Sequence, residues 1–179
     1  MRGVFSGVNF QSNDFELFNL EQKFKQSSAA IELRWKELQR EAHPDKFVMQ
    51  GTAAQRVAMQ WSVRINEAYR RLKDPRSRAA YLCELNGVPV NAENSTAMPA
   101  EFLMVQIEWR EALDDATTLE NLYELAMQAN KYVCNQLLKI EQSIDFETDF
   151  EHAVEHIRAL MFVERFSAEV DTRIDQLQQ

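Results

Sequence analysis

The sequence predicts an all-α protein built from two helical modules, and three observations lead to this prediction. The 179 residues include only 4 Gly and 4 Pro, which disfavours sheets and long flexible linkers. Apolar side chains recur three and four residues apart through most of the chain, as on one face of a helix. The charges are uneven: residues 1–90 carry 14 Lys and Arg against 10 Asp and Glu, whereas residues 91–179 carry 6 against 18. A basic half followed by an acidic half indicates two modules with different partners.

The first half opens with two predicted helices. A short one is expected over residues 14–19, where Phe15 and Phe18 lie on one side. A second is expected over residues 27–42, because apolar residues recur there at i, i+4, i+7 and i+11 and form one stripe. These residues are Ile31, Trp35, Leu38 and Ala42. Pro44 must end this helix, since proline has no backbone N–H and disfavours the α conformation in the residue before it.

A third helix is predicted to begin at Thr52, with Gln55 three residues later completing a capping box. Its apolar stripe consists of Val57, Trp61, Ile65, Ala68 and Leu72, with Tyr69 alongside. Asp74 then serves as the N-cap of a fourth helix, whose first residue is Pro75 and which stops at Gly87.

The segment 88–98 is the predicted linker, because it is polar, non-periodic and contains a proline. Pro99 then opens a helix that ends near Ala116. Two further helices begin at Thr-x-x-Glu capping boxes and run to about Glu141 and towards the C-terminus. The boxes are Thr117 with Glu120 and Thr148 with Glu151. Three long helices with short connections predict an antiparallel three-helix bundle.

Composition and patterning disfavour several classes of protein. No apolar run reaches the ~20 residues that a membrane span needs, and the first residues resemble neither a signal peptide nor a transit peptide. The acidic second half disfavours a nucleic-acid partner, because phosphate binding needs a concentrated basic surface. Cys83 and Cys134 lie far apart without metal-ligand spacing, so both are expected to be reduced and to pack in a core. This usage suits a cytoplasmic protein, and no cofactor is expected.

Residues 40–47 read REAHPDKF and raise the question of a catalytic or metal site. His43 and Asp45 could supply half of one, but a nucleophile or third ligand would have to come from elsewhere. The other histidines, His152 and His156, lie in the distant acidic half. Their i, i+4 spacing places them on one helix face, yet no HExxH-type companion accompanies them. We therefore expect a solvated histidine pair and no metal.

The same loop is well suited to docking a partner protein. Pro44 makes the loop rigid, so that His43 and Asp45 are held outward as a donor and an acceptor. Arg34, Lys36, Arg40 and Lys46 lie around it and form a basic surface that favours an acidic partner. By themselves these four charges are also compatible with an ordinary solvated helix face.

Two segments carry a resemblance to a known family. HPDKF between two amphipathic helices, followed by INEAYRRLKDPRSRAAYL at residues 65–82, resembles a J-domain. The Gly/Phe-rich linker and CxxCxGxG module of general J-proteins are missing from the sequence. Instead PAEFLMVQIEWREALDDA at residues 99–116 resembles the second domain of the HscB family of iron–sulfur co-chaperones. Together the matches cover nearly the whole chain after residue 13, and without N-terminal CxxC pairs they point to the bacterial form.

The resemblance implies a non-enzymatic co-chaperone in which the two modules have separate roles. A J-domain over residues 12–87 would stimulate the ATPase of HscA, a DnaK-type chaperone. A three-helix domain over residues 99–179 would bind the scaffold protein IscU, and the two would form an L-shaped molecule. The residues implied in chaperone binding are His43, Pro44, Asp45, Arg34, Arg40 and Lys46.

The helix over residues 99–116 also suggests an interface by its own pattern. On a helical wheel, one side gathers the predicted core residues Phe102, Val105, Trp109 and Leu113. Leu103, Met104 and Ile107 fall on the other side, among acidic residues, as in an interaction patch. A wide stripe that packs against both neighbouring helices is the alternative.

The HscB resemblance implies a scaffold-binding surface at the same place. Its residues would be Leu103, Met104, Ile107, Glu108, Glu111 and Asp115, with Phe162 from the last helix. The sequence has Ile107 where Leu is expected and Asp115 where Glu is usual, and both changes preserve the chemistry.

Two other functions stay open at this point. One is a J-protein that delivers a different client. The other belongs to a different class, a metal-binding protein or hydrolase centred on His43, His152 and His156.

Overall fold

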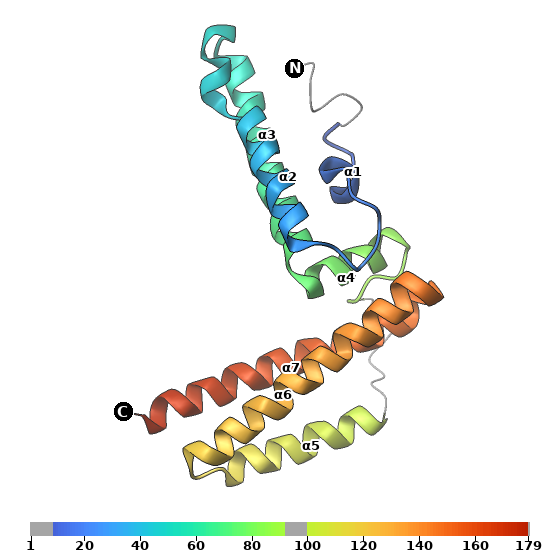
Figure 1. Cartoon of the computed structure of the whole chain (residues 1–179), viewed down its shortest axis with the longest axis vertical. Helices are drawn as coiled ribbons and strands as arrows, with labels where there is room; N and C mark the ends of the chain where they lie inside the picture. The colour runs from blue at the N-terminus through green and yellow to red at the C-terminus, as the bar shows by residue number, and fades with distance from the viewer. Residues whose placement is uncertain (1–8, 92–99, 179) are drawn as a thin grey trace. The chain divides into compact units, whose positions relative to one another are not determined.

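The computed structural model describes residues 9–91 and 100–178, and within them every regular element is a helix (Figure 1). The all-α prediction is therefore confirmed. The chain divides into two compact units, Met1–Arg78 and Ala79–Gln179. The domain ranges 12–87 and 99–179, and the L-shaped arrangement, stay predictions. Pro99 and most of the predicted linker lie outside the described residues.

The first unit is a helical hairpin with a short helix beside it. Its elements are α1 (Asp14–Phe18), α2 (Ser28–Glu41), the 3₁₀ helix η1 (Pro44–Gln50) and α3 (Thr52–Lys73). Helices α2 and α3 run antiparallel, with η1 at the tip of the hairpin (Figure 1). Ser27 caps α2 by accepting a hydrogen bond from the Ala30 N–H, so this helix has its predicted position.

The predicted apolar stripes of α2 and α3 face the interior, with one correction. Ile31, Leu38 and Ala42 of the first stripe are fully buried, and so are the last three of the second. At the start of α3, however, the buried residue is Ala58, whereas Val57 is 37% exposed. Ala58 shares the buried face of α3 with Trp61, Ile65, Ala68 and Leu72, which recur at i+3, i+7, i+10 and i+14, whereas Val57 lies at the edge of that face.

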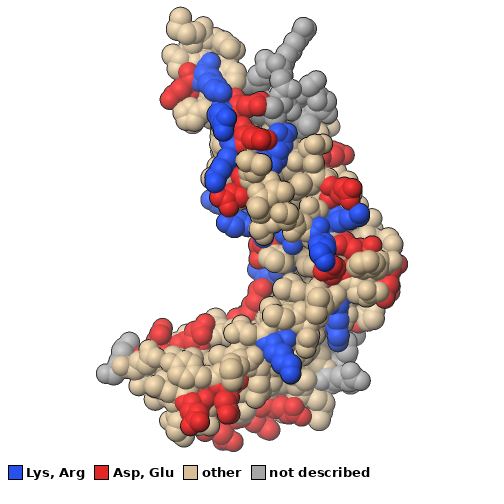
Figure 2. Space-filling model, viewed as in Figure 1, with Lys and Arg blue, Asp and Glu red and all other residues tan. Residues whose placement is uncertain are grey.

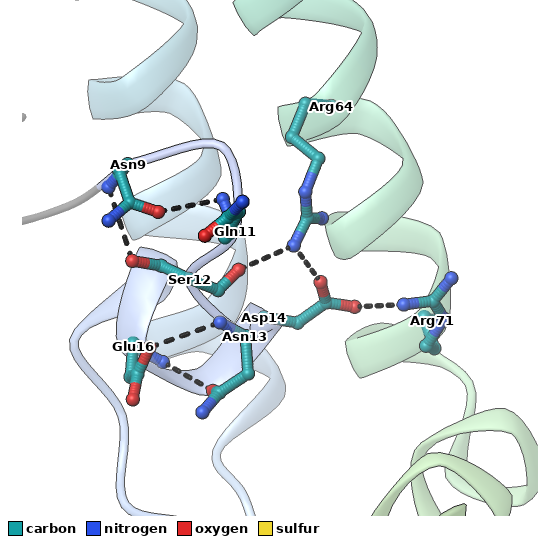
Figure 3. Close-up of polar contacts among 8 residues, drawn as sticks. All are labelled: Asn9, Gln11, Ser12, Asn13, Asp14, Glu16, Arg64 and Arg71. Carbon is teal, nitrogen blue, oxygen red and sulfur yellow. Dashed lines mark hydrogen bonds and ion pairs between the residues drawn. The ribbon is translucent and has the colours of Figure 1, made fainter. Parts of the chain in front are cut away.

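Helix α1 is anchored to α3 by a buried carboxylate that the sequence did not reveal (Figure 3). Asp14 is fully buried and forms ion pairs with Arg64 at 2.6 Å and Arg71 at 2.8 Å. Arg64 also donates to the Ser12 carbonyl at 3.0 Å. The paired cations offset the free energy needed to remove Asp14 from water, so the short helix acquires a defined place on α3.

Three predicted capping boxes are wrong in their details. Helix α3 has Gly51 as its N-cap, without a side-chain bond, because Thr52 is already helical. Thr118, and not Thr117, caps α6 by accepting from the Asn121 N–H. Asp149, and not Thr148, caps α7, since Thr148 adopts a left-handed conformation with φ of 59°. In each case a neighbouring residue has the extended or otherwise non-helical backbone that a cap requires.

The second unit is an antiparallel three-helix bundle, as predicted. It contains the end of α4 (Pro75–Leu85), then α5 (Ala100–Asp115), α6 (Leu119–Glu141), the π-helical turn η2 (Gln142–Glu147) and α7 (Phe150–Leu177). Asp74 caps α4 through the Ser77 N–H at 2.8 Å, as its sequence predicts. The bundle core is formed by buried residues of α5, α6 and α7, among them Trp109, Leu122 and Phe166.

The end of α4 and the first residues of the predicted linker are tied to the first half of α7. The Cys83 thiol contacts the Phe150 carbonyl at 3.8 Å, and Arg158 donates to the Val90 carbonyl at 2.7 Å. Cys83 is fully buried as predicted. The prediction that Cys134 also packs in a core is wrong, because this residue lies on the exposed side of α6. No described helix is long and apolar enough to cross a membrane.

Candidate functional site

The tip of the α2–α3 hairpin presents the first candidate site on a short, well-defined turn. Helix α2 ends at Ala42, and Pro44 begins η1 directly afterwards. His43, between them, is extended with φ of −63° and ψ of 124°, as expected for a residue before proline. Phe47 is 8% exposed and anchors η1 against the hairpin. The backbone therefore changes direction at the residue that carries the imidazole.

Both polar side chains at the tip point into solvent. The side chain of His43 is 58% exposed and that of Asp45 is 85% exposed. They also contact each other: His43 Nδ1 lies 3.6 Å from an Asp45 carboxylate oxygen and accepts the Asp45 backbone N–H at 3.4 Å. The tip thus offers a partner one imidazole and one carboxylate on a fixed backbone, as the sequence predicts.

The basic surface beside the tip is only partly available. Arg40 and Lys46 are exposed. Arg34 is less accessible, since its side chain is 22% exposed and donates to Glu37 at 3.2 Å. Figure 2 shows Lys and Arg in a row along the hairpin unit. A carboxylate-bearing partner would therefore meet Arg40 and Lys46 first.

The structure also reveals tip features that the sequence reasoning missed. Val48 is 54% exposed and Met49 is 96% exposed, so two apolar side chains lie on η1 next to Asp45. Beneath the tip, Asn66 accepts hydrogen bonds from two side chains of α2. The sequence contained a signal for the Asn66 hydrogen bonds, since the INEAY segment places this asparagine within the apolar stripe of α3.

The outer face of α5 presents the second candidate site. Phe102, Trp109 and Leu113 are at most 9% exposed, which confirms the predicted core side of the helix. On the opposite side Leu103, Met104 and Ile107 are 46%, 59% and 55% exposed. The alternative, in which these residues pack against neighbouring helices, is therefore wrong. Glu108, Glu111 and Asp115 are exposed beside them.

Aromatic packing holds this helix in place and defines where Phe162 lies. The Trp109 ring is 5.0 Å from Phe166 and 5.5 Å from Tyr132. The Phe162 ring is 5.5 Å from Phe102 in an edge-to-face arrangement, and Phe162 is half-buried against the bundle core. Phe162 thus lies at the margin of the core, unlike the three exposed apolar residues of α5.

The charge distribution differs between the candidate sites. The visible surface of the three-helix unit carries groups of Asp and Glu and few Lys and Arg (Figure 2). One of the cations, Arg110, pairs with Glu169 of α7, and this pairing raises its pKa further above the usual arginine value. The apolar patch of α5 is therefore bordered mainly by carboxylates.

The two histidines of α7 form a pair that is not fully solvated. Their rings stack with centroids 4.9 Å apart. His152 is exposed, whereas burial and the neighbouring His152 lower the pKa of His156 to about 4. The expectation of a solvated pair is thus wrong for His156. In the described part of the chain, no three His, Cys, Asp or Glu residues are placed to hold a metal ion.

Comparison with known proteins finds a family profile and curated relatives that all carry the HscB name. A family profile described as "HSCB C-terminal oligomerisation domain" matches residues 98–171. The co-chaperone protein HscB homolog of Burkholderia thailandensis is 42% identical over 174 residues, which cover 96% of this chain and 99% of that protein. The Burkholderia vietnamiensis homolog is 40% identical with the same coverage.

Solved structures agree with this similarity. Chaperone HscB from Vibrio cholerae has a TM-score of 0.79 and 29% identity, and the match covers 93% of this chain and 99% of that one. The human co-chaperone protein HscB has a TM-score of 0.80 at 24% identity, covering 94% of this chain and 83% of that one, and supports the fold.

Proposed function

The chain belongs to the HscB family of co-chaperones, and we propose from this that it stimulates the ATPase of a DnaK-type chaperone, HscA, in the cytoplasm. We further propose that it delivers the iron–sulfur scaffold protein IscU to that chaperone and so assists the maturation of iron–sulfur proteins. The observation that carries the proposal is the exposed His43-Pro44-Asp45 tip in a chain of this family. The chain itself catalyses no hydrolysis in this proposal.

The tip acts on the chaperone by binding one of its conformations more tightly than another. A bound protein can shift a conformational equilibrium only through such a difference in affinity. His43 and Asp45 are suited to this role because both are exposed on a backbone whose direction Pro44 restricts. Arg40 and Lys46 would attract an acidic surface of the ATPase, with Arg34 supporting them from its position beside Glu37.

The second unit binds the scaffold through the outer face of α5. Leu103, Met104 and Ile107 would supply the apolar contact area at its centre. The surrounding carboxylates would set orientation and exclude wrong partners. The proposed surface consists of these three residues with Glu108, Glu111, Asp115 and Phe162. Phe162 would contribute from the margin of the core, where the partner can meet its exposed part.

The tip is tested by measuring ATPase rate against co-chaperone concentration. His43→Gln should abolish stimulation while binding of the scaffold is unchanged, because the two sites lie in different units. His152→Gln is the matched control: it makes the same substitution at an exposed histidine of α7 and should stimulate like the unmodified protein. If His43→Gln stimulated fully, the proposed role of the tip would be contradicted.

The patch is tested by a triple substitution of Leu103, Met104 and Ile107 with Ala. Scaffold affinity should fall by about tenfold or more, since a few residues near the centre of an interface carry most of its binding energy, and truncating such a residue costs more than about 1 kcal/mol. Basal stimulation of the ATPase should persist. The control is the replacement of Tyr123, Met127 and Leu138 with Ala. These residues are 48%, 67% and 64% exposed on α6. Unchanged scaffold affinity in the α5 variant would contradict the client assignment.

Both halves are tested together by adding the scaffold to the ATPase titration. If the protein delivers the scaffold, the two should stimulate synergistically, and either variant above should remove the synergy. Additive stimulation would indicate a co-chaperone whose client is a different protein.

A further inference from the structure

The carbonyl of Ala42, at the end of α2, requires a partner from outside its own helix. Ala42 is fully buried, so an unpaired polar group here would be unfavourable. Continuation of the helix would provide the backbone N–H of residue 46. Instead the Lys46 N–H donates to the His43 carbonyl at 3.0 Å, because the chain turns at Pro44 into η1. The Ser62 hydroxyl of α3 donates to the Ala42 carbonyl at 3.3 Å.

Ser62 belongs to a set of polar contacts between the last turns of α2 and the middle of α3. Gln39 donates from its side-chain amide to the Ser62 carbonyl at 3.2 Å and to Asn66 Oδ1 at 2.7 Å. Asn66 Oδ1 also accepts the indole N–H of Trp35 at 2.9 Å. Each of these bonds is partly buried and joins residues 20 to 31 positions apart. We call Trp35, Gln39, Ser62 and Asn66 the interhelical network.

The interhelical network restricts the position and rotation of α2 on α3, in addition to stabilising the hairpin. Apolar packing along the stripes brings α2 and α3 together, but it tolerates small sliding and rotation of one helix on the other. Hydrogen bonds to one side-chain amide oxygen and two backbone carbonyls restrict both movements, because their strength falls quickly with distance and angle. The Trp35 indole is further confined by stacking on the Tyr69 ring, with centroids 4.7 Å apart. The residue fixed at the end of the network, Ala42, immediately precedes His43.

We propose that Ser62 and Asn66 are positioning residues for the His43-Pro44-Asp45 tip. Ser62 fixes the Ala42 carbonyl. Asn66 fixes Trp35 and Gln39 of α2, and Gln39 in turn donates to the Ser62 carbonyl. The network thereby determines the direction in which His43 and Asp45 face the ATPase, without itself touching the partner. This proposal rests on the proposed function of the tip. It gives the polar Asn66 of the INEAY segment a role in stimulating the ATPase, which a place in the apolar stripe of α3 does not explain.

The test is an ATPase titration, in which the half-maximal concentration reports on binding to the chaperone and the rate at saturation reports on stimulation. Ser62→Ala removes one hydroxyl and leaves Arg40, Lys46 and the whole tip sequence in place. The stimulated rate at saturation should fall by about tenfold, since small misplacement of reacting groups has large effects on rate. The concentration that gives half-maximal stimulation should change less than about twofold, because the docking charges are untouched.

Two further variants distinguish positioning from general destabilisation. Ser77→Ala is the matched control, since the Ser77 hydroxyl also makes an intramolecular hydrogen bond in the first unit, to Asp74 at the start of α4. It should lower the unfolding midpoint comparably and leave saturated stimulation unchanged. Ser62→Thr restores a hydroxyl and should recover most of the stimulated rate. At Asn66 the same comparison uses two variants. Asn66→Asp keeps both acceptor bonds and should retain most of the stimulated rate, whereas Asn66→Leu loses them and should lower it.

A measurement on the protein alone gives an independent readout. Hydrogen exchange of the Lys46 amide, which donates to His43, should accelerate in Ser62→Ala and not in Ser77→Ala. The proposal is overturned if Ser62→Ala stimulates normally at saturation, or if both serine variants lose stimulation in proportion to their stability. Failure of the unmodified protein to stimulate any DnaK-type ATPase would overturn the proposed function instead, and the exchange result would still report on the network.

Discussion

At the scale of single residues, the two cysteines differ in reactivity because their surroundings differ. Cys83 is fully buried, and burial raises the pKa of its thiol to about 11. Cys134 is exposed on α6. Since the thiolate is the reactive form, Ellman's reagent at pH 8 should modify one thiol promptly in the native protein and the second only after unfolding in urea. Cys134→Ser should remove the fast phase, and a fast phase of two thiols would contradict the assignment.

His156 should make stability depend on pH. Burial, His152 and Lys139 lower its pKa from 6.5 to about 4, against a smaller opposite effect of Glu147. In this range the unfolded chain binds the proton first, so the contribution of neutral His156 is complete above pH 6.5 and is lost as the pH falls towards 4. The free energy of unfolding by urea, measured at pH 7 and pH 4.5, should fall less in His156→Gln than in the unmodified protein. An identical fall in both proteins would show that His156 titrates normally.

At the scale of elements, α1 should depend on its buried carboxylate. Asp14→Asn leaves Arg64 and Arg71 without their anionic partner and should lower the free energy of unfolding by about 3 kcal/mol. Glu16→Gln, which changes an exposed carboxylate of the same helix, should have a much smaller effect. Chemical denaturation of both variants provides the comparison. Equal losses would mean that the ion pairs do not anchor α1.

The start of α6 distinguishes two adjacent threonines. Thr118 accepts the Asn121 N–H at 3.2 Å, so Thr118→Ala should lower the free energy of unfolding by about 1 kcal/mol. Thr117→Ala should be nearly neutral, because Thr117 is exposed and precedes the cap. Thermal unfolding of the two variants compares their stabilities directly. A larger loss of stability in Thr117→Ala would show that Thr117, the residue predicted from the sequence, is the N-cap of α6.

At the scale of the whole molecule, the uneven charge should govern the response to salt. The first 90 residues are net basic and the remainder is strongly acidic. If the basic hairpin attracts an acidic ATPase surface, raising the salt from about 0.05 M to 0.3 M should raise the half-maximal concentration severalfold and leave the saturated rate nearly unchanged. Arg40→Gln should weaken this dependence. A half-maximal concentration that does not respond to salt would argue against electrostatic docking.

Much of this molecule could be predicted from local pattern alone. Apolar spacing placed the helices, Pro44 marked the end of α2, and the wheel of α5 separated Trp109 from Met104 correctly. These features are predictable because they depend on residues within a few positions of one another: helix periodicity, proline stereochemistry and side-chain direction are local properties. The His43-Pro44-Asp45 tip belongs with them, since its sequence specifies its conformation.

Other features depend on residues that meet only after folding. Val57 and Ala58 lie at opposite edges of one stripe, and only the packing of α3 against its neighbouring elements decides which is buried. Cys134 fits a helical pattern, yet it faces away from the core that α5 and α7 provide. Capping likewise depends on backbone angles that neighbouring elements impose, as at Thr148.

By itself, then, the sequence determined the helical fold class, the positions of the helices, the exposed tip and the family of this protein. The tertiary structure alone decided that Asp14 pairs with Arg64 and Arg71, 50 and 57 positions away, and that Asn66 and Ser62 hold the end of α2. The physical reason is the same in both cases. A buried polar group must be paired, and when its partner comes from another helix, only the packing of the two helices can identify it.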